Sequence, residues 1–170
     1  MHYNLPHINQ KNLYQFITFR TKDSIDDYIR TLTKTDLPTK KLQQTIDTYL
    51  DTSKKGAYLN DVIITIVKDY LLNLDKNKCD IISFIIMPNH IHILLIQKQN
   101  LSDIIQYIKG GLSFIINKKL NKKGTFWQKD YFDRVIRDEK HFELTYNYIK
   151  NNAIKANLKD AKERFFSIYE

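Results

Sequence analysis

Apolar residues along the chain form blocks with two different spacings, one typical of strands and one typical of helices. Residues 13–21 (LYQFITFRT) have the aromatic and β-branched content of a strand. The segments 79–87 (CDIISFIIM) and 90–96 (HIHILLI) predict two further strands around a Pro-Asn turn. A last strand is predicted over 131–138 (YFDRVIRD). These four segments are expected to pair into one sheet.

Two helices are predicted between the strands, where apolar residues recur every three or four positions. The first covers residues 61–74, with Asn60 as its N-cap. The second begins near Ser102 and carries a long isoleucine-rich stripe. Gly110 and Gly111 interrupt this second helix, so we expect either a bend or a close backbone approach there.

A final helix is predicted over residues 139–156, where Asp138 can cap the first turn. Its core-facing stripe consists of Phe142, Tyr146, Ile149, Ala153 and Ala156. The segment 22–58 is polar, and short helices such as 41–50 (KLQQTIDTYL) joined by loops are expected in it.

The predicted element order is β-α-β-β-α-β followed by a C-terminal helix. This order matches the ferredoxin-like α+β arrangement, an antiparallel sheet with helices on one face. The other face of the sheet is then left open to carry a site. No repeat, low-complexity tract or Pro/Gly/Ser linker divides the chain, so residues 1–170 are expected to form a single domain.

Composition indicates a soluble protein of the cytoplasm. The hydrophobic fraction of 42% is ordinary for a globular domain, and the lone Cys79 excludes an intramolecular disulfide. The N-terminus lacks the blocks of a signal peptide, and no apolar run reaches membrane-spanning length. Between Lys109 and Arg164 there are 14 basic and 7 acidic residues. This excess fits either a surface that binds a polyanion or a solvated lysine-rich surface.

Two pairs of polar side chains are candidates for chemistry. His90 and His92 are two residues apart in a strand, so they project to the same face and can share one cation. The alternative is a pair of half-buried histidines that bond to backbone carbonyls, and we expect neither ring to carry much core burial. Tyr148 and Asn152 lie one turn apart on the final helix and offer a phenol and an amide oxygen. By itself such a pair is usually surface.

Four blocks of the sequence resemble one family. The stretch MPNHIHILL is similar to the MPNH-hydrophobic-H motif of the HUH single-tyrosine transposases (IS200-like), in particular of their REP-associated tyrosine transposase group. IIQYIKGGLSFIINKKL, GTFWQKDYFDRVIRDEKHF and YIKNNAIKANL resemble the family's later blocks, in the same order. The sequence departs from the family at Ala153, where the family has proline, and at Asn157, where it has glycine.

The resemblance implies a metal-dependent endonuclease and transposase that cleaves and rejoins single-stranded DNA near hairpins through a 5′-phosphotyrosine. Transferred residue by residue, it makes Tyr148 the nucleophile and His90, His92 and Asn152 the ligands of Mg²⁺ or Mn²⁺. The resemblance also implies that the partner is single-stranded DNA with a hairpin. The protein would then lie in the cytoplasm, associated with the nucleoid, and act as a monomer or a homodimer. No residue stands out in the sequence as a base for the tyrosine.

DNA contacts are expected from basic and aromatic side chains that can follow a backbone or stack on bases. They are Lys109, Lys118, Lys119, Lys122, Lys123, Trp127, Lys129, Tyr131, Arg134 and Arg137. For Trp127, core packing is an equal alternative. A second functional class remains open, a domesticated hairpin-binding protein without cleavage activity. A zinc hydrolase lacks support, because His2, His7 and His141 are scattered.

Overall fold

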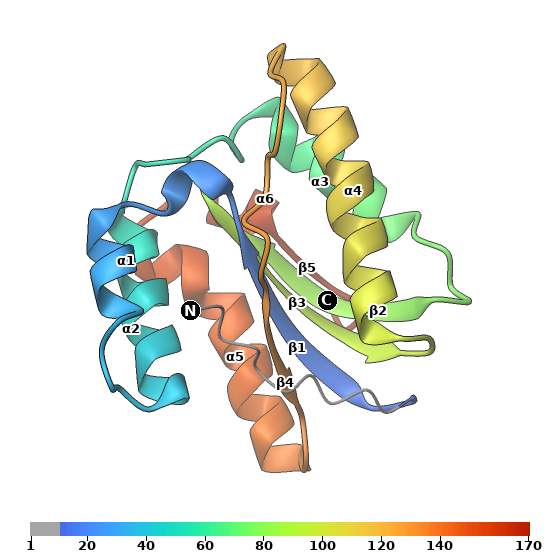
Figure 1. Ribbon diagram of the computed structural model, residues 1–170. Helices are drawn as coiled ribbons and strands as arrows, with labels where there is room; N and C mark the ends of the chain where they lie inside the picture. Colours follow the sequence, from blue (N-terminus) through green and yellow to red (C-terminus); the bar gives the residue numbers. More distant parts are fainter. Residues whose placement is uncertain (1–10) are drawn as a thin grey trace.

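A computed structural model describes residues 11–170, and its centre is one five-stranded sheet (Figure 1). All neighbouring strands are antiparallel, in the order β4-β1-β3-β2-β5. The strands are β1 (Tyr14–Arg20), β2 (Cys79–Ile86), β3 (His90–Gln97), β4 (Phe132–Val135) and β5 (Phe165–Ser167). The four predicted strands are confirmed in the ferredoxin-like order, and β5 is an additional edge strand.

The central strand β3 separates two different faces of the sheet. Ile91, Ile93 and Leu95 point into the larger hydrophobic cluster, whereas Leu94 belongs to a second cluster on the other side. Because side chains alternate along a strand, His90 and His92 point to the same side as Leu94. The histidines therefore lie on the face of the smaller cluster.

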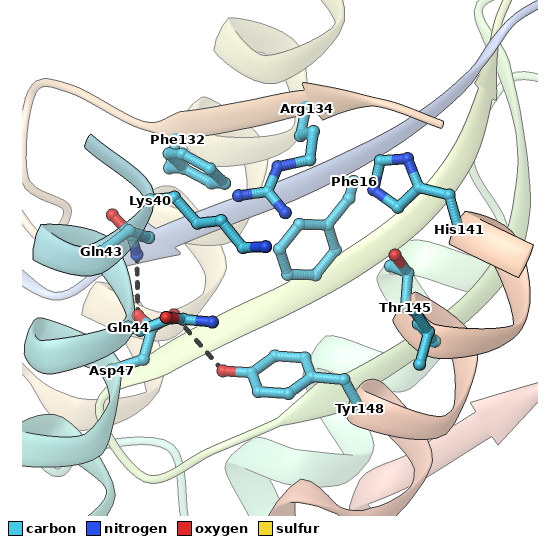
Figure 2. A pocket seen from close by; sticks show the side chains of 11 residues that line it. Phe16, Lys40, Gln43, Gln44, Asp47, Phe132, Arg134, His141, Thr145 and Tyr148 are labelled. Carbon is cyan, nitrogen blue, oxygen red and sulfur yellow. Dashed lines mark hydrogen bonds between the residues drawn. The ribbon is translucent and has the colours of Figure 1, made fainter. Parts of the chain in front are cut away.

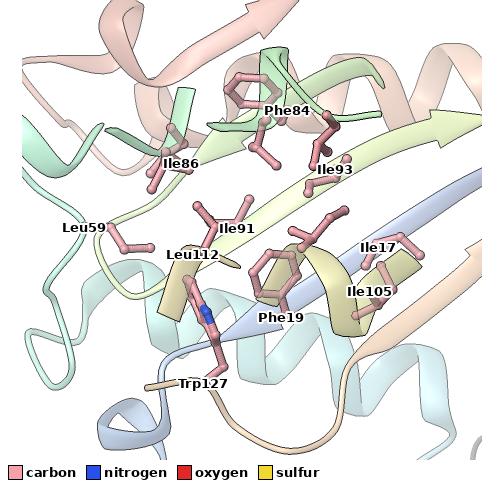
Figure 3. Packing of buried hydrophobic residues seen from close by; sticks show 14 of the residues in the cluster. Ile17, Phe19, Leu59, Phe84, Ile86, Ile91, Ile93, Ile105, Leu112 and Trp127 are labelled. Atoms are coloured by element: carbon pink, nitrogen blue, oxygen red, sulfur yellow. The ribbon is translucent and has the colours of Figure 1, made fainter. Parts of the chain in front are cut away.

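Two helices cover the face of the larger cluster, α3 (Val62–Leu72) and α4 (Leu101–Leu120). Isoleucine and leucine side chains of both helices belong to the larger cluster. Figure 3 shows Ile105 and Leu112 of α4 beside Phe19, Ile91 and Trp127. The helix α4 runs without interruption through both glycines. A Cβ at Gly111 would overlap the Tyr70 ring of α3, so the predicted close approach is confirmed and the bend is not.

The predicted cap of α3 is wrong. Its N-cap residue is Asp61, and the Asn60 side chain is used elsewhere. The buried Arg164 donates from Nη2 to Asn60 Oδ1 at 2.6 Å and from Nη1 to the carbonyls of Leu59 and Ile86, both at 2.9 Å. Asn60 therefore helps to join the short helix α6 (Ala161–Arg164) to the start of α3.

The opposite face of the sheet is covered by α5 (Glu139–Lys155), which Figure 1 shows across the strands from α3 and α4. The expectation of an open face is therefore corrected, because Ile149 and Ala153 of α5 are fully buried against it. Asn157 follows the helix with φ +54°, and Leu158 N–H donates to the Ala153 carbonyl at 3.0 Å. Asparagine tolerates this left-handed conformation, so it replaces the family's glycine at little cost.

The segment that the sequence described least clearly folds beside α5. It contains the 3-10 turn η1 (Lys22–Ser24), α1 (Asp27–Leu32) and α2 (Thr39–Thr52), which is longer than the predicted 41–50. A small cluster of Ile29, Ile46 and Leu50 joins the two helices. None of the helices in the described part of the chain could span a membrane.

Candidate functional site

His90 and His92 lie side by side, with ring centroids 4.7 Å apart. Each ring is held by its Nδ1 atom, which lies 2.7 Å from Asn89 Oδ1 in His90 and 2.7 Å from Thr18 Oγ1 in His92. Both Nε2 atoms are thereby left for other partners. Both side chains are fully buried, so the expectation that they carry little core burial is wrong.

The surroundings keep both imidazoles neutral. Burial lowers the pKa of His92 to about 3, with a smaller contribution from the nearby Arg20 charge. Burial also lowers the pKa of His90 well below its ordinary value, assisted by His92 and Arg20. A neutral imidazole is the form that binds a metal ion.

Tyr148 faces the histidines from α5. Its phenolic oxygen lies 3.4 Å from His92 Nε2 and donates to Asp47 Oδ2 at 3.3 Å. The His92 ring is flanked by Tyr148 and by Phe16, with centroids 5.2 and 5.5 Å away. Burial, followed by the Asp47 and Asp51 charges, raises the pKa of Tyr148, so the phenol is protonated at neutral pH.

Asn152 lies one turn beyond Tyr148 and is only 3% exposed. Its Oδ1 atom is buried and has no hydrogen-bond partner among the described residues. The structure thus brings Tyr148 of α5 into contact with the histidine pair of β3, and the fourth predicted site residue, Asn152, lies one helical turn from that contact.

Two carboxylates that sequence reasoning missed come from α2. Asp47 accepts from Gln43 Nε2 at 2.7 Å as well as from Tyr148, and Asp51 Oδ1 lies 3.6 Å from His90 Nε2. Burial raises the pKa of Asp47 to about 6, against the opposing charge of Arg20. Burial, followed by the Asp47 charge, raises the pKa of Asp51 to about 7.

Asn89 holds this end of α2 against the histidines. Its Oδ1 meets His90 Nδ1, and its Nδ2 donates to the carbonyls of Leu50, Ser53 and Lys55 at 3.0, 3.2 and 3.4 Å. The asparagine of the MPNH motif therefore links the strand turn to the helix that carries the carboxylates. That contact exists only in the folded chain, so no signal in the sequence pointed to α2.

The donors at the site fit a small divalent cation. No three His, Cys, Asp or Glu side chains within residues 11–170 form a group that could hold an ion. The set here is instead two neutral imidazoles and the amide oxygen of Asn152, with the Asp51 carboxylate next to them. His90 Nε2, Asp51 Oδ1 and Asn152 Oδ1 are all buried without a hydrogen-bond partner in the described chain. Leaving such atoms unpaired is costly, and a bound cation would satisfy them.

The predicted DNA contacts divide into exposed and occupied side chains. Trp127 is withdrawn as a stacking residue, because it is 3% exposed and packs edge-on against Phe19 in the core. Lys109 is also occupied, since its Nζ donates to the carbonyls of Gln128 and Lys129 at 2.6 and 2.9 Å. Burial lowers the pKa of Lys109 to about 8. Both residues stabilise the segment before β4.

The other predicted contacts lie at or near the surface. Lys122 lies over the Tyr58 ring, 4.3 Å from its centroid, and Tyr131 is half-buried against the larger cluster. Arg134 is half-buried beside Phe132, 5.5 Å from the ring centroid. The remaining basic side chains are exposed, namely Lys118, Lys119, Lys123, Lys129 and Arg137.

A pocket of about 460 Å³ opens beside Tyr148 (Figure 2). Its walls come from α2, β1, β4 and α5. The lining side chains are Phe16, Lys40, Gln43, Gln44, Asp47, Phe132, Arg134, His141, Leu144, Thr145 and Tyr148. His141, in the first turn of α5, thus lines the approach to Tyr148.

Comparison with known proteins gives matches in family, sequence and fold. A model of the family described as "Transposase IS200 like" matches residues 40–152. An uncharacterized protein of Haemophilus influenzae is 30% identical, over 42% of this chain and 52% of that protein. The chain therefore spans about half the length of this curated relative. A solved structure of a REP-associated tyrosine transposase bound to a REP hairpin has a TM-score of 0.57 at 13% identity, covering 89% of this chain and 73% of that chain. At this identity the likeness concerns the fold.

Proposed function

This chain belongs to the IS200-like transposase family, and from that premise we propose that it is a metal-dependent endonuclease and transposase of single-stranded DNA. It cleaves and rejoins strands near hairpins through a 5′-phosphotyrosine intermediate. Residues 1–170 act in this proposal as one HUH domain. The protein acts in the cytoplasm in this proposal, on the DNA of the nucleoid.

The observation that carries the proposal is the 3.4 Å distance between the Tyr148 hydroxyl and His92 Nε2. A nucleophilic oxygen and two neutral imidazoles converge at this point, so one phosphate can meet both. The match of sequence blocks alone leaves the tyrosine and the histidines in separate elements. Their contact supports Tyr148 as the attacking residue.

We assign the cation to His90, His92 and Asn152, with Asp51 alongside. When bound, Mg²⁺ or Mn²⁺ supplies a Lewis acid that neutralises charge on the phosphate and its leaving oxygen. The chain's own contribution is to fix the donors. Thr18 and Asn89 orient the two rings through Nδ1, so that each ring presents its Nε2 atom to the site.

Attack by the Tyr148 oxygen on phosphorus breaks the bond to the 3′-oxygen. The 5′-phosphate remains on the tyrosine, and the leaving oxygen takes a proton from water to become a 3′-hydroxyl. Asp47 Oδ2 already accepts the phenolic hydrogen bond, so we assign Asp47 to take the proton of the Tyr148 hydroxyl as its oxygen attacks. A 3′-hydroxyl can later attack the phosphotyrosine and rejoin the strand without a nucleotide cofactor.

The exposed lysines at the C-terminal end of α4 and in the loop after it are assigned to the DNA backbone. Lys118, Lys119 and Lys123 project from the end of this helix and the loop after it. The solved structure of similar fold is bound to a REP hairpin, which supports a hairpin-bearing strand as partner. The protein acts as a monomer or a homodimer in this proposal.

Incubation with labelled single-stranded hairpin DNA from the flanks of its own gene tests the proposal. With Mn²⁺, a denaturing gel should show a shorter strand and a protein-linked strand. With a chelator, both should disappear. Tight hairpin binding without any cleavage product would favour the other class, a domesticated binding protein.

A further inference from the structure

The pocket beside Tyr148 has chemistry that the cleavage step itself does not require. Its floor is apolar, formed by Phe16 and Phe132, whose ring centroids lie 6.3 Å apart. Leu144, which is 63% exposed, adds an apolar rim on α5. Water alone is a poor occupant for such a surface, so the pocket suits a ligand with a flat apolar part.

Two positively charged side chains, Lys40 and Arg134, line the pocket next to this apolar floor. Figure 2 shows Lys40 reaching in from α2 and Arg134 from β4, with their charged ends close to Phe16. Lys40 is exposed, and no ion pair is found for it in the described part of the chain. The other polar groups of the lining are the side chains of Gln43, Gln44, His141 and Thr145, and the Asp47 carboxylate beside the Tyr148 hydroxyl. The ligand should therefore combine anionic charge with a hydrogen-bonding edge.

A single nucleotide has all three properties: a flat base, a polar base edge and a phosphate. The volume of about 460 Å³ lies at the small end of the range for small-molecule sites. It is large enough for one base, whose pairing edge would face the polar side chains of Gln44 and Thr145 in place of a partner base. A base in this pocket must therefore be unpaired.

The position of the pocket selects which nucleotide it can hold. In an in-line displacement the leaving 3′-oxygen lies opposite the attacking phenolic oxygen, so the nucleotide before the cut points away from Tyr148. The nucleotide after the cut keeps its 5′-phosphate on Tyr148. Because the pocket borders the Tyr148 ring, it lies next to this second nucleotide.

We propose that this pocket binds the unpaired nucleotide on the 3′ side of the cut, the one that becomes linked to Tyr148. This inference rests on the proposed function and deepens it. The base lies against the apolar floor and beneath Arg134, and Lys40 contacts the adjoining phosphate. The pocket then selects a single strand at the cut and holds the linked strand until it is rejoined.

An abasic-site experiment on the full-length protein tests the pocket. The substrate is a hairpin oligonucleotide that wild type cleaves, and the readout is the rate of covalent adduct formation. Removing the base immediately after the cut should slow adduct formation about tenfold, the scale of one stacked base. Removing a base three positions further along should have little effect.

Pocket variants make the test specific. Arg134→Ala and Leu144→Trp change exposed or half-buried side chains and should leave the fold intact. Each should slow cleavage of the intact strand about tenfold yet slow the abasic strand no further, since the same contact is already lost. Lys155→Ala, at an exposed position of α5 outside the pocket, is the matched control.

The outcomes separate this inference from the proposed function. Adducts that form equally fast with and without the base after the cut would overturn the pocket assignment and leave the endonuclease proposal standing. So would pocket variants that slow intact and abasic strands by the same factor. Failure of wild type to form an adduct with any hairpin strand would overturn both.

Discussion

The phenolic oxygen of Tyr148 and the Nε2 atom of His92 lie 3.4 Å apart, although 56 residues separate them in the chain. The contact joins the helix over one face of the sheet to the central strand. On the other side of the phenol, Asp47 accepts its hydrogen bond from α2. Three elements from distant parts of the sequence therefore meet at one hydroxyl group.

The first prediction removes that hydroxyl. Tyr148→Phe keeps the ring against Phe16 and His92 and deletes only the attacking oxygen. The variant should bind hairpin DNA as wild type does and form no covalent adduct. Its free energy of unfolding should change by no more than about 1 kcal/mol, the net value of one hydrogen bond. Denaturing gels and peptide mapping of the adduct check this, and an adduct in the variant would mean that another tyrosine is the nucleophile.

A second prediction concerns the metal ligands. His90→Ala and His92→Ala should each weaken Mn²⁺ binding at least tenfold, measured by calorimetry or electron paramagnetic resonance. Because both rings are fully buried, each change should also lower the free energy of unfolding by about 2–4 kcal/mol. Thermal denaturation measures that cost separately. Unchanged Mn²⁺ affinity in a folded variant would contradict the assignment.

The sequence predicted the histidine and Tyr148–Asn152 pairs of the site but not its two carboxylates. The histidine pair and the Tyr148–Asn152 pair were visible because strand and helix periodicity place each pair on one face. Asp47 and Asp51 lie in the polar segment 22–58, where no local pattern distinguishes a buried carboxylate from a solvated one. Their importance arises from tertiary contacts with Tyr148 and His90, which spacing cannot reveal.

The same contrast between local patterns and tertiary contacts explains which helices and strands could be predicted. Long apolar stripes predicted α3, α4 and the central strands, because their residues face a core on one side. The edge strand β5 has only three residues and depends on pairing with β2, so no pattern marked it. Trp127 could equally have stacked on DNA or packed inside. Its position beneath α4, against Phe19, is set by the chain returning from the end of that helix.

A third prediction concerns Asp47 and pH. Its carboxyl has a pKa of about 6 in the folded protein, above the ordinary 3.8, so the folded state holds the proton more tightly. Stability contributed by this group is full below pH 4 and lost as pH rises through 6. Asp47→Asn cannot ionise, so it should raise the free energy of unfolding by about 1–3 kcal/mol at pH 8 and leave it unchanged at pH 4. Urea titrations at both values measure the difference.

The same substitution should have the opposite effect on chemistry. Without the carboxylate, proton transfer from Tyr148 loses its acceptor, and adduct formation should slow about a hundredfold, the lower range for acid–base groups. DNA binding by Asp47→Asn should match wild type. A variant that is both more stable at pH 8 and equally fast would show that Asp47 is not the base.

A fourth prediction concerns the backbone of the DNA. Binding of hairpin strands should weaken steeply with salt, because lysine contacts release condensed counterions. Replacing Lys118, Lys119 and Lys123 together by alanine should reduce the slope of log affinity against log salt by about 2, near 0.7 for each single-strand contact. Lys109→Ala should leave that slope unchanged, since its amine is bound to the carbonyls of Gln128 and Lys129. Filter binding over a salt series measures this slope for wild type, for the triple variant and for Lys109→Ala.

The last prediction compares two buried polar residues, Asn89 in the turn between β2 and β3 and Ser83 on β2. The fully buried Asn89 side chain donates hydrogen bonds to the carbonyls of Leu50, Ser53 and Lys55, and its Oδ1 meets the His90 ring. The buried Ser83 Oγ, by contrast, has no hydrogen-bond partner in the described chain. Asn89→Ala should therefore lower the free energy of unfolding by about 2–4 kcal/mol, because it leaves several buried groups without hydrogen-bond partners. Ser83→Ala should leave the free energy of unfolding unchanged or raise it slightly. Loss of Asn89 also frees the end of α2, so Asp51 should leave His90 and Mn²⁺ binding should weaken in the folded variant. If Asn89→Ala destabilises the protein yet binds Mn²⁺ like wild type, α2 is held for stability alone and not for the site.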